Sequence, residues 1–289
     1  MPYNLLYHSC SAFPSFFLES NIKIGACDWA LPGSGLYATQ IAASVGLEAL
    51  SLKIGLYEND YPITHPEMQQ IYLGEQQKYG IEYCAIALND FDNIPMHARE
   101  GTKEHDIVWD LLERAVETAH ALHVPMIQVP GFAASEVKTE EDMEHSAKAF
   151  RWLCDTAGEY GISVAGENLM TVSEFTKMHE MVGRKNFYLY FDSQNYNVFR
   201  GYDERKILQG LYPKMCNQLH VKDGTEMSGG LLGSGPSGFH ETIDWLKAHG
   251  YTGYILLENY YDQLPLRLQA ENPYDLLRED IRILRQALQ

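Results

Sequence analysis

The sequence is poor in basic residues, since its 289 residues hold 22 Lys and Arg against 39 Asp and Glu. The resulting formal net charge of −17 repels phosphate backbones. We therefore expect no general binding of nucleic acid. The net charge does not exclude a small anionic substrate that binds at a locally positive site.

Cysteines are few, and none forms a C-x-x-C pair. The five residues are scattered along the chain: Cys10, Cys27, Cys84, Cys154 and Cys216. This pattern argues against a disulfide framework and favours a reducing compartment, which predicts a cytoplasmic protein.

A long hydrophobic run is also missing, because no stretch of about 18 apolar residues occurs, and we expect no membrane-spanning segment. Residues 1–21 are apolar and aromatic, but they lack a basic start and are broken by Pro14, which argues against a signal peptide. We interpret 1–21 as an N-terminal extension. With no linker visible, residues 22–289 are predicted to form one catalytic domain.

What the chain does have is a regular alternation of strand-like apolar runs and amphipathic helical segments, with 45% hydrophobic residues to fill a core. Thr139 and Asp142 resemble a capping box, and Asn272 before Pro273 is a good start for the last helix. Eight strand–helix pairs predict an α/β fold, a closed (β/α)8 TIM barrel.

An open doubly wound sheet is the alternative fold. Such a sheet usually carries a glycine-rich phosphate turn after its first strand. Here Gly33 and Gly35 follow that strand, but the sequence PGSG does not make the G-x-G-x-x-G pattern.

Four consecutive predicted strands end in a residue that can bind a metal. These strand ends read GEN, FDSQN, LHVKD and LEN, and they supply Glu167, Asp192, His220 and Glu258. In a TIM barrel they would meet at one rim. Three carboxylates there would repel unless a cation or protons compensate them. The set suits Mn²⁺, Mg²⁺ or Co²⁺, and Zn²⁺ is also allowed. An ordinary ion pair is the alternative for each residue alone.

These motifs follow the order found in a known family, together with a G-x-G loop at Gly233 and Gly235. Over residues 22–289 the chain resembles the xylose isomerase-like TIM barrels of sugar and sugar-phosphate isomerases and epimerases. The FDSQN and HVKD forms are most similar to L-ribulose/L-xylulose 5-phosphate 3-epimerases. Tagatose- and psicose-type epimerases often carry His where Asn195 stands and an Arg after strand seven, and residues 223–240 hold no Arg.

The resemblance implies that Glu167, Asp192, His220 and Glu258 bind one divalent metal and that the two glutamates are acid/base catalysts. The implied activity is epimerisation or isomerisation of a ketose or ketose phosphate through a metal-bound enediolate. Alternatives on the same barrel are an inosose dehydratase-like lyase and a hydroxypyruvate isomerase-like enzyme. A non-catalytic sugar-binding barrel is disfavoured by the paired glutamates, and endonuclease IV by the negative charge and single cluster.

A second group of residues is expected to contact the substrate, a small sugar or sugar phosphate. This group comprises Trp29, Lys53, Gln128, Asn195, Lys222, Gly233 and Gly235. Backbone N–H groups of the loop 228–238 can cradle a phosphate, although such a loop can also simply be flexible. For Lys53 and Lys222, a salt bridge is the alternative role. The sequence leaves a homo-oligomer open.

Overall fold

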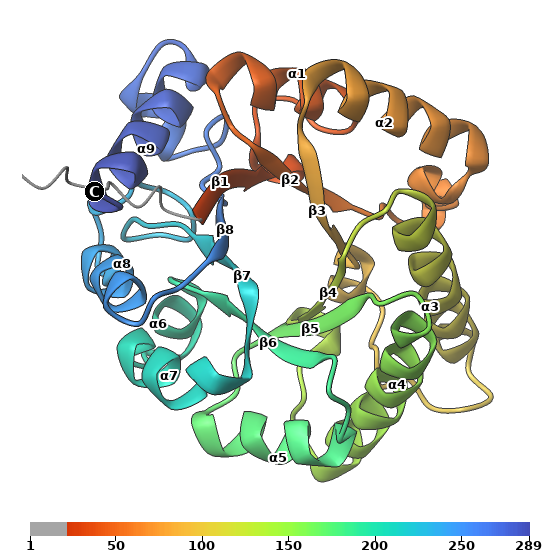
Figure 1. Cartoon of the computed structure of the whole chain (residues 1–289). Coiled ribbons are helices and arrows are strands. Elements are labelled where there is room, and N and C mark those ends of the chain that lie inside the picture. The colour runs from red at the N-terminus through yellow and green to blue at the C-terminus, as the bar shows by residue number, and fades with distance from the viewer. Residues whose placement is uncertain (1–21) are drawn as a thin grey trace, which may run out of the picture.

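The computed structural model describes residues 22–289, whose eight parallel strands close into a barrel in the order β1 to β8. Figure 1 looks along this barrel and shows the helices arranged around it. The predicted TIM barrel is therefore confirmed and the open sheet is excluded. The N-terminal extension predicted for residues 1–21 lies outside the described residues.

The strands are short and largely buried, as parallel strands covered on both faces must be. Their bounds are β1 Ile22–Cys27, β2 Ala49–Lys53, β3 Glu82–Ala87, β4 Met126–Gly131, β5 Ser163–Asn168, β6 Phe187–Asp192, β7 Met215–Val221 and β8 Gly253–Leu257. The barrel closes where β1 pairs with β8, for example at Ile24 and Ile255. All the strands point the same way, so their carboxyl ends form one rim.

The helices pack outside the strands and begin where the sequence supplies caps. Their bounds are α1 Leu36–Val45, α2 Pro66–Tyr79, α3 Lys103–Ala121, α4 Glu140–Gly158, α5 Val172–Val182, α6 Asn195–Arg200, α7 Glu204–Leu211, α8 Phe239–Ala248 and α9 Pro273–Ala287. The predicted capping box is present, because the Asp142 N–H donates to Thr139 Oγ1 over 3.1 Å and the Asp142 carboxylate accepts from the Thr139 N–H. Asn272 caps α9 as expected.

One helix was not expected from the sequence. The segment after β6 was predicted to enter a single helix, but it forms the short α6 before α7. Gly201, in the left-handed conformation with φ 64°, ends α6 and lets the chain turn into α7. As a result, α6 starts at Asn195, close to the rim.

The barrel interior below the rim is filled mainly by small side chains. Cys27, Ala49, Cys84 and Ala165 pack there around Tyr190. Ala165, two residues before Glu167 on β5, belongs to this inner cluster. A larger cluster fills the layer between the strands and the helices. No helix of residues 22–289 is long and apolar enough to cross a membrane.

Candidate active site

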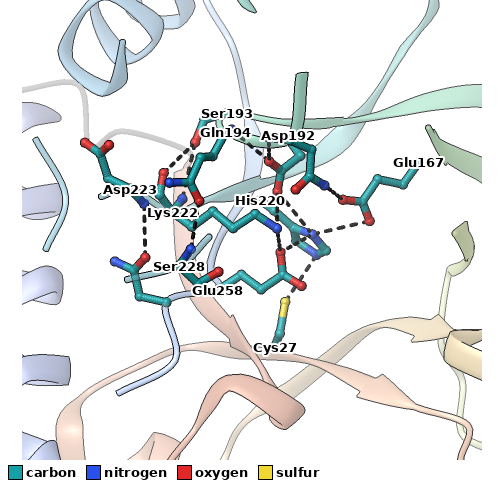
Figure 2. Close-up of polar contacts among 12 residues, drawn as sticks. Cys27, Glu167, Asp192, Ser193, Gln194, His220, Lys222, Asp223, Ser228 and Glu258 are labelled. Carbon is teal, nitrogen blue, oxygen red and sulfur yellow. Dashed lines mark hydrogen bonds and ion pairs between the residues drawn. The ribbon is translucent and has the colours of Figure 1, made fainter. Parts of the chain in front are cut away.

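The four predicted metal-binding residues lie together at the carboxyl end of the barrel. Glu167 and Asp192 stand at the ends of β5 and β6, His220 lies in β7, and Glu258 directly follows β8. One ligand atom from each lies within 4.8 Å of the others. Figure 2 shows the His220 ring between the two glutamates.

His220 Nδ1 is the common neighbour of the three carboxylates. It lies 3.2 Å from Glu258 Oε2, 3.5 Å from Glu167 Oε2 and 3.9 Å from Asp192 Oδ2. Strand register explains this placement, because Asp192 pairs with His220 between neighbouring strands. Side chains alternate along a strand, so His220 and Lys222 both point inward.

The second ring nitrogen of His220 contacts a thiol. Cys27 Sγ lies 3.2 Å from His220 Nε2, and burial raises the pKa of the Cys27 thiol to about 12. With a proton on Nε2 facing the sulfur, Nδ1 presents its lone pair to the carboxylates. Cys27 is fully buried, and its contact with Nε2 fixes the orientation of His220.

Asp192 is held by backbone groups on one oxygen only. Its Oδ1 accepts hydrogen bonds from the N–H groups of Gln194 and Asn195, at 2.8 and 2.7 Å. Burial raises the pKa of Asp192 to about 6, against the opposing pull of Lys222. The second oxygen, Oδ2, faces the cluster.

The two glutamates are held by side chains that were expected to contact substrate. Glu167 Oε1 accepts from Asn195 Nδ2 over 2.8 Å, and its Oε2 accepts from Gln128 Nε2 over 2.5 Å. Trp29 Nε1 donates to Glu258 Oε1 over 2.8 Å. These contacts fix the orientation of both carboxylates before any substrate binds.

Lys222 lies inside the carboxylate cluster. Its ammonium nitrogen is 2.5 Å from Glu258 Oε2 and 3.1 Å from Asp192 Oδ2, and the side chain is buried. Burial raises the pKa of Glu258, but Lys222 and His220 outweigh it and hold that pKa well below its usual range. The ion pair considered from the sequence therefore exists, and its partners are two of the predicted metal ligands.

The donor atoms of this cluster fit a divalent metal. Among the described residues, His220 Nδ1 and Asp192 Oδ2 are buried and form no hydrogen bond, although both point into the cluster, and Asp192 Oδ2 has only its ion pair with Lys222. Buried polar atoms normally form hydrogen bonds, so two such atoms facing one point suggest a missing ligand. Three carboxylates and an imidazole match the preferences of Mn²⁺, Mg²⁺, Co²⁺ and Zn²⁺.

A cavity of about 750 Å³ opens above the cluster. Its lining includes the predicted residues Trp29, Lys53, Gln128, Glu167, Asn195, Lys222 and Glu258. The volume suits a small molecule such as a sugar or its phosphate.

Sequence reasoning missed the part of the cavity wall that follows β3. Asn89, Asp92 and Asn93 line it there. The available signal was the polar run NDFDN directly after strand three.

The structure does not bring Gly233 and Gly235 to the cavity. They line a separate hollow, and the N–H groups of Gly233 and Ser237 donate to the Asp223 carboxylate over 2.8 and 3.3 Å. The buried Asp223 thus occupies the anion-binding position that this loop was expected to offer a phosphate. The loop is held by the protein's own carboxylate, which explains how a glycine-rich segment keeps one conformation.

Fold and site together define a TIM barrel with a carboxylate–histidine centre at its carboxyl rim. The family description "Xylose isomerase-like TIM barrel" matches residues 40–287, and the chain belongs to this family.

Individual relatives can be named. The chain is 29% identical over 253 residues to 2-epi-5-epi-valiolone 7-phosphate 2-epimerase of Actinoplanes sp., covering 86% of this chain and 92% of the relative. Among solved structures, D-psicose 3-epimerase with D-tagatose from Clostridium cellulolyticum H10 superposes with a TM-score of 0.75 at 13% identity, covering 92% of this chain and 99% of that one. The IolI protein with a binding zinc atom gives 0.72 at 18%, covering 92% and 98%. These structural likenesses show the fold alone.

Proposed function

We propose that the chain is a metal-dependent epimerase or isomerase of a ketose or ketose phosphate. One observation carries the proposal: two buried glutamates, Glu167 and Glu258, flank His220 Nδ1 at the floor of a sugar-sized cavity and both line that cavity. The name of the Actinoplanes relative, an epimerase of a phosphorylated compound, supports it.

The two carboxylates provide the pair of bases that an epimerisation needs. A C–H group beside a ketone is too weak an acid to ionise unaided, and a bound divalent cation supplies Lewis-acid polarisation of the carbonyl. One glutamate takes the proton from one face of the carbon, and the other returns a proton to the opposite face. The substrate's configuration decides which glutamate acts first. Removal of a proton from C1 of a ketose, with return of a proton to C2, would instead give an aldose.

The residues around the glutamates keep them in place for this transfer. Gln128 and Asn195 bind Glu167, while Trp29 and Lys222 bind Glu258. Carboxylates that are already oriented need little reorganisation when the proton moves. We assign Gln128, Asn195 and Trp29 a positioning role in addition to any contact with substrate.

The wall of the cavity suggests how the rest of the substrate binds. Two further cations line it, Lys53 and Arg200, and Arg200 is paired with Glu136. We propose that Lys53 contacts the anionic group of a phosphorylated substrate, and that Asn89 and Asp92 bind hydroxyl groups. Residues 228–238 do not line this cavity.

Deuterium exchange tests the proposal. The Mn²⁺-loaded chain is incubated in D₂O with free ketoses, pentulose 5-phosphates and 2-epi-5-epi-valiolone 7-phosphate, and products are followed by NMR. We expect deuterium at a carbon next to the carbonyl and the appearance of an epimer, both abolished when a chelator removes the metal. A metal-loaded chain that exchanges no proton of any candidate would refute the proposal. Loss of water with a new ultraviolet chromophore would indicate the lyase instead.

A further inference from the structure

Lys222 and the proposed metal would use the same oxygen atoms. Lys222 Nζ contacts Glu258 Oε2 and Asp192 Oδ2. These two oxygens also face His220 Nδ1, the remaining donor of the cluster. Figure 2 shows the lysine chain reaching across to both carboxylates. The ammonium therefore lies beside the point where the donor atoms converge.

An ammonium at this position supplies a counter-charge to the buried carboxylates. Glu167, Asp192 and Glu258 are all at least 94% buried, and buried carboxylates without a counter-charge destabilise a folded chain strongly. Lys222, only 3% exposed, supplies one positive charge to them. The cluster is thus partly neutralised by the chain itself before any metal binds.

A divalent cation at the same oxygens would be in conflict with this ammonium. Carboxylate oxygens bind such ions at about 2.0–2.6 Å. With Lys222 still 2.5 Å from Glu258 Oε2 and 3.1 Å from Asp192 Oδ2, two positive charges would lie within a few ångströms in a buried site. Repulsion at that range is strong because the interior screens it poorly. Lys222 lines the cavity, so its ammonium can move away from the carboxylates into the cavity.

We propose that Lys222 is an internal counter-cation, which a divalent metal must displace from Glu258 and Asp192 in order to bind. The inference rests on the metal site of the proposed function. It implies that the chain binds its metal more weakly than three carboxylates and an imidazole alone would allow. It also implies that Lys222 stabilises the metal-free fold.

Metal titration of the full chain provides the test. Chelator-stripped wild type, Lys222→Met and Lys53→Met are titrated with Mn²⁺ by calorimetry. Methionine keeps most of the aliphatic chain and removes the charge. We expect Lys222→Met to bind Mn²⁺ at least about ten-fold more tightly, about 1.4 kcal/mol. Lys53 lines the same cavity, but its charge interacts with Asp28 rather than with the metal-binding cluster. Lys53→Met should therefore change the Mn²⁺ affinity by less than about three-fold.

Thermal unfolding gives an independent readout. Lys222→Met should lower the melting temperature of the metal-free chain, and saturating Mn²⁺ should restore most of the loss. Where Lys222→Met does not fold without metal, Lys222→Gln replaces it, because the amide can still donate to Glu258 while carrying no charge. Lys222→Gln is also expected to bind Mn²⁺ at least about ten-fold more tightly than wild type.

Two results overturn the inference and are distinguishable. Unchanged or weaker Mn²⁺ binding in the lysine variants, with normal binding by wild type, refutes the displacement alone and leaves the proposed function intact. A wild-type chain that takes up none of Mn²⁺, Co²⁺ and Zn²⁺ refutes the metal site and the displacement together.

Discussion

The ends of β5 and β8 carry the same residue in two different settings. Glu167 and Glu258 are similarly buried, at 4% and 6% exposure, and each accepts hydrogen bonds on both oxygens. The donors to Glu167 are the neutral amides of Gln128 and Asn195. Glu258 instead faces the Lys222 ammonium and the Trp29 indole. One glutamate is therefore held by neutral dipoles and the other by a positive charge.

This difference indicates that the two bases are not interchangeable. A nearby cation favours the ionised form of Glu258 and holds its pKa low. Glu167 takes its orientation from the neutral amides of Gln128 and Asn195. An active site that must move a proton in both directions can use such a difference, because each direction starts from a different base.

The largest expected effect is the loss of turnover when either base is removed. Glu167→Gln and Glu258→Gln should each lower kcat by about 10²–10⁴-fold, the usual contribution of an acid/base group. In D₂O, each variant should still exchange the proton of the one epimer that meets the remaining glutamate, measured by NMR. Equal residual exchange with both epimers in both variants would contradict the assignment of one glutamate to each face.

Much of this site was predictable from the sequence. The βα repeat predicted which strand each acid ends. That repeat places Glu167, Asp192, His220 and Glu258 on one rim, because parallel strands in a barrel end on the same side. Capping of α4 and α9 was equally readable, since caps depend on residues a few positions apart.

What the sequence could not predict depends on side-chain conformations and on distant partners. Lys222 was expected to contact substrate or to form a salt bridge, but only its side-chain conformation shows that it reaches Glu258 and Asp192. The loop 228–238 is a similar case. The Asp223 carboxylate accepts hydrogen bonds from its backbone N–H groups. No local sequence pattern predicts that a protein carboxylate, rather than a phosphate, binds these N–H groups. Nor does any local pattern tie Gln128 to Glu167 across two strands.

A smaller effect is expected on stability, and it should differ between the two glutamates. Glu258→Gln leaves the Lys222 ammonium buried with one partner fewer and should lower the free energy of unfolding of the metal-free chain by about 3–5 kcal/mol. Glu167→Gln places an amide against the amides of Gln128 and Asn195, so one mismatched donor should cost about 1–3 kcal/mol. Urea unfolding at pH 7 measures both. Equal losses would show that the lysine contributes nothing beyond a neutral donor.

The pH dependence of that stability difference provides a control. The pKa of Glu258 is lowered by folding, so its contribution is present above the ordinary value of 4.5 and is lost as the pH falls below it. The gap between wild type and Glu258→Gln should therefore narrow when urea unfolding is repeated at pH values descending from 4.5. A gap that stays constant there would mean that the ionised form of Glu258 is not what stabilises the chain.

The smallest effect concerns single donors to each glutamate. Gln128→Leu removes one of the two amides on Glu167 and should lower the free energy of unfolding of the metal-free chain by about 1.5–3 kcal/mol, because a hydrogen bond to a charged group contributes that much and nothing ionic replaces it. Trp29→Phe removes the indole donor of Glu258, but in the metal-free chain the Lys222 ammonium remains 2.5 Å away. The loss of stability in Trp29→Phe should therefore be smaller, about 0.5–1.5 kcal/mol. Urea unfolding of the metal-free variants measures both losses, and a larger loss in Trp29→Phe would contradict the proposed difference between the two glutamates.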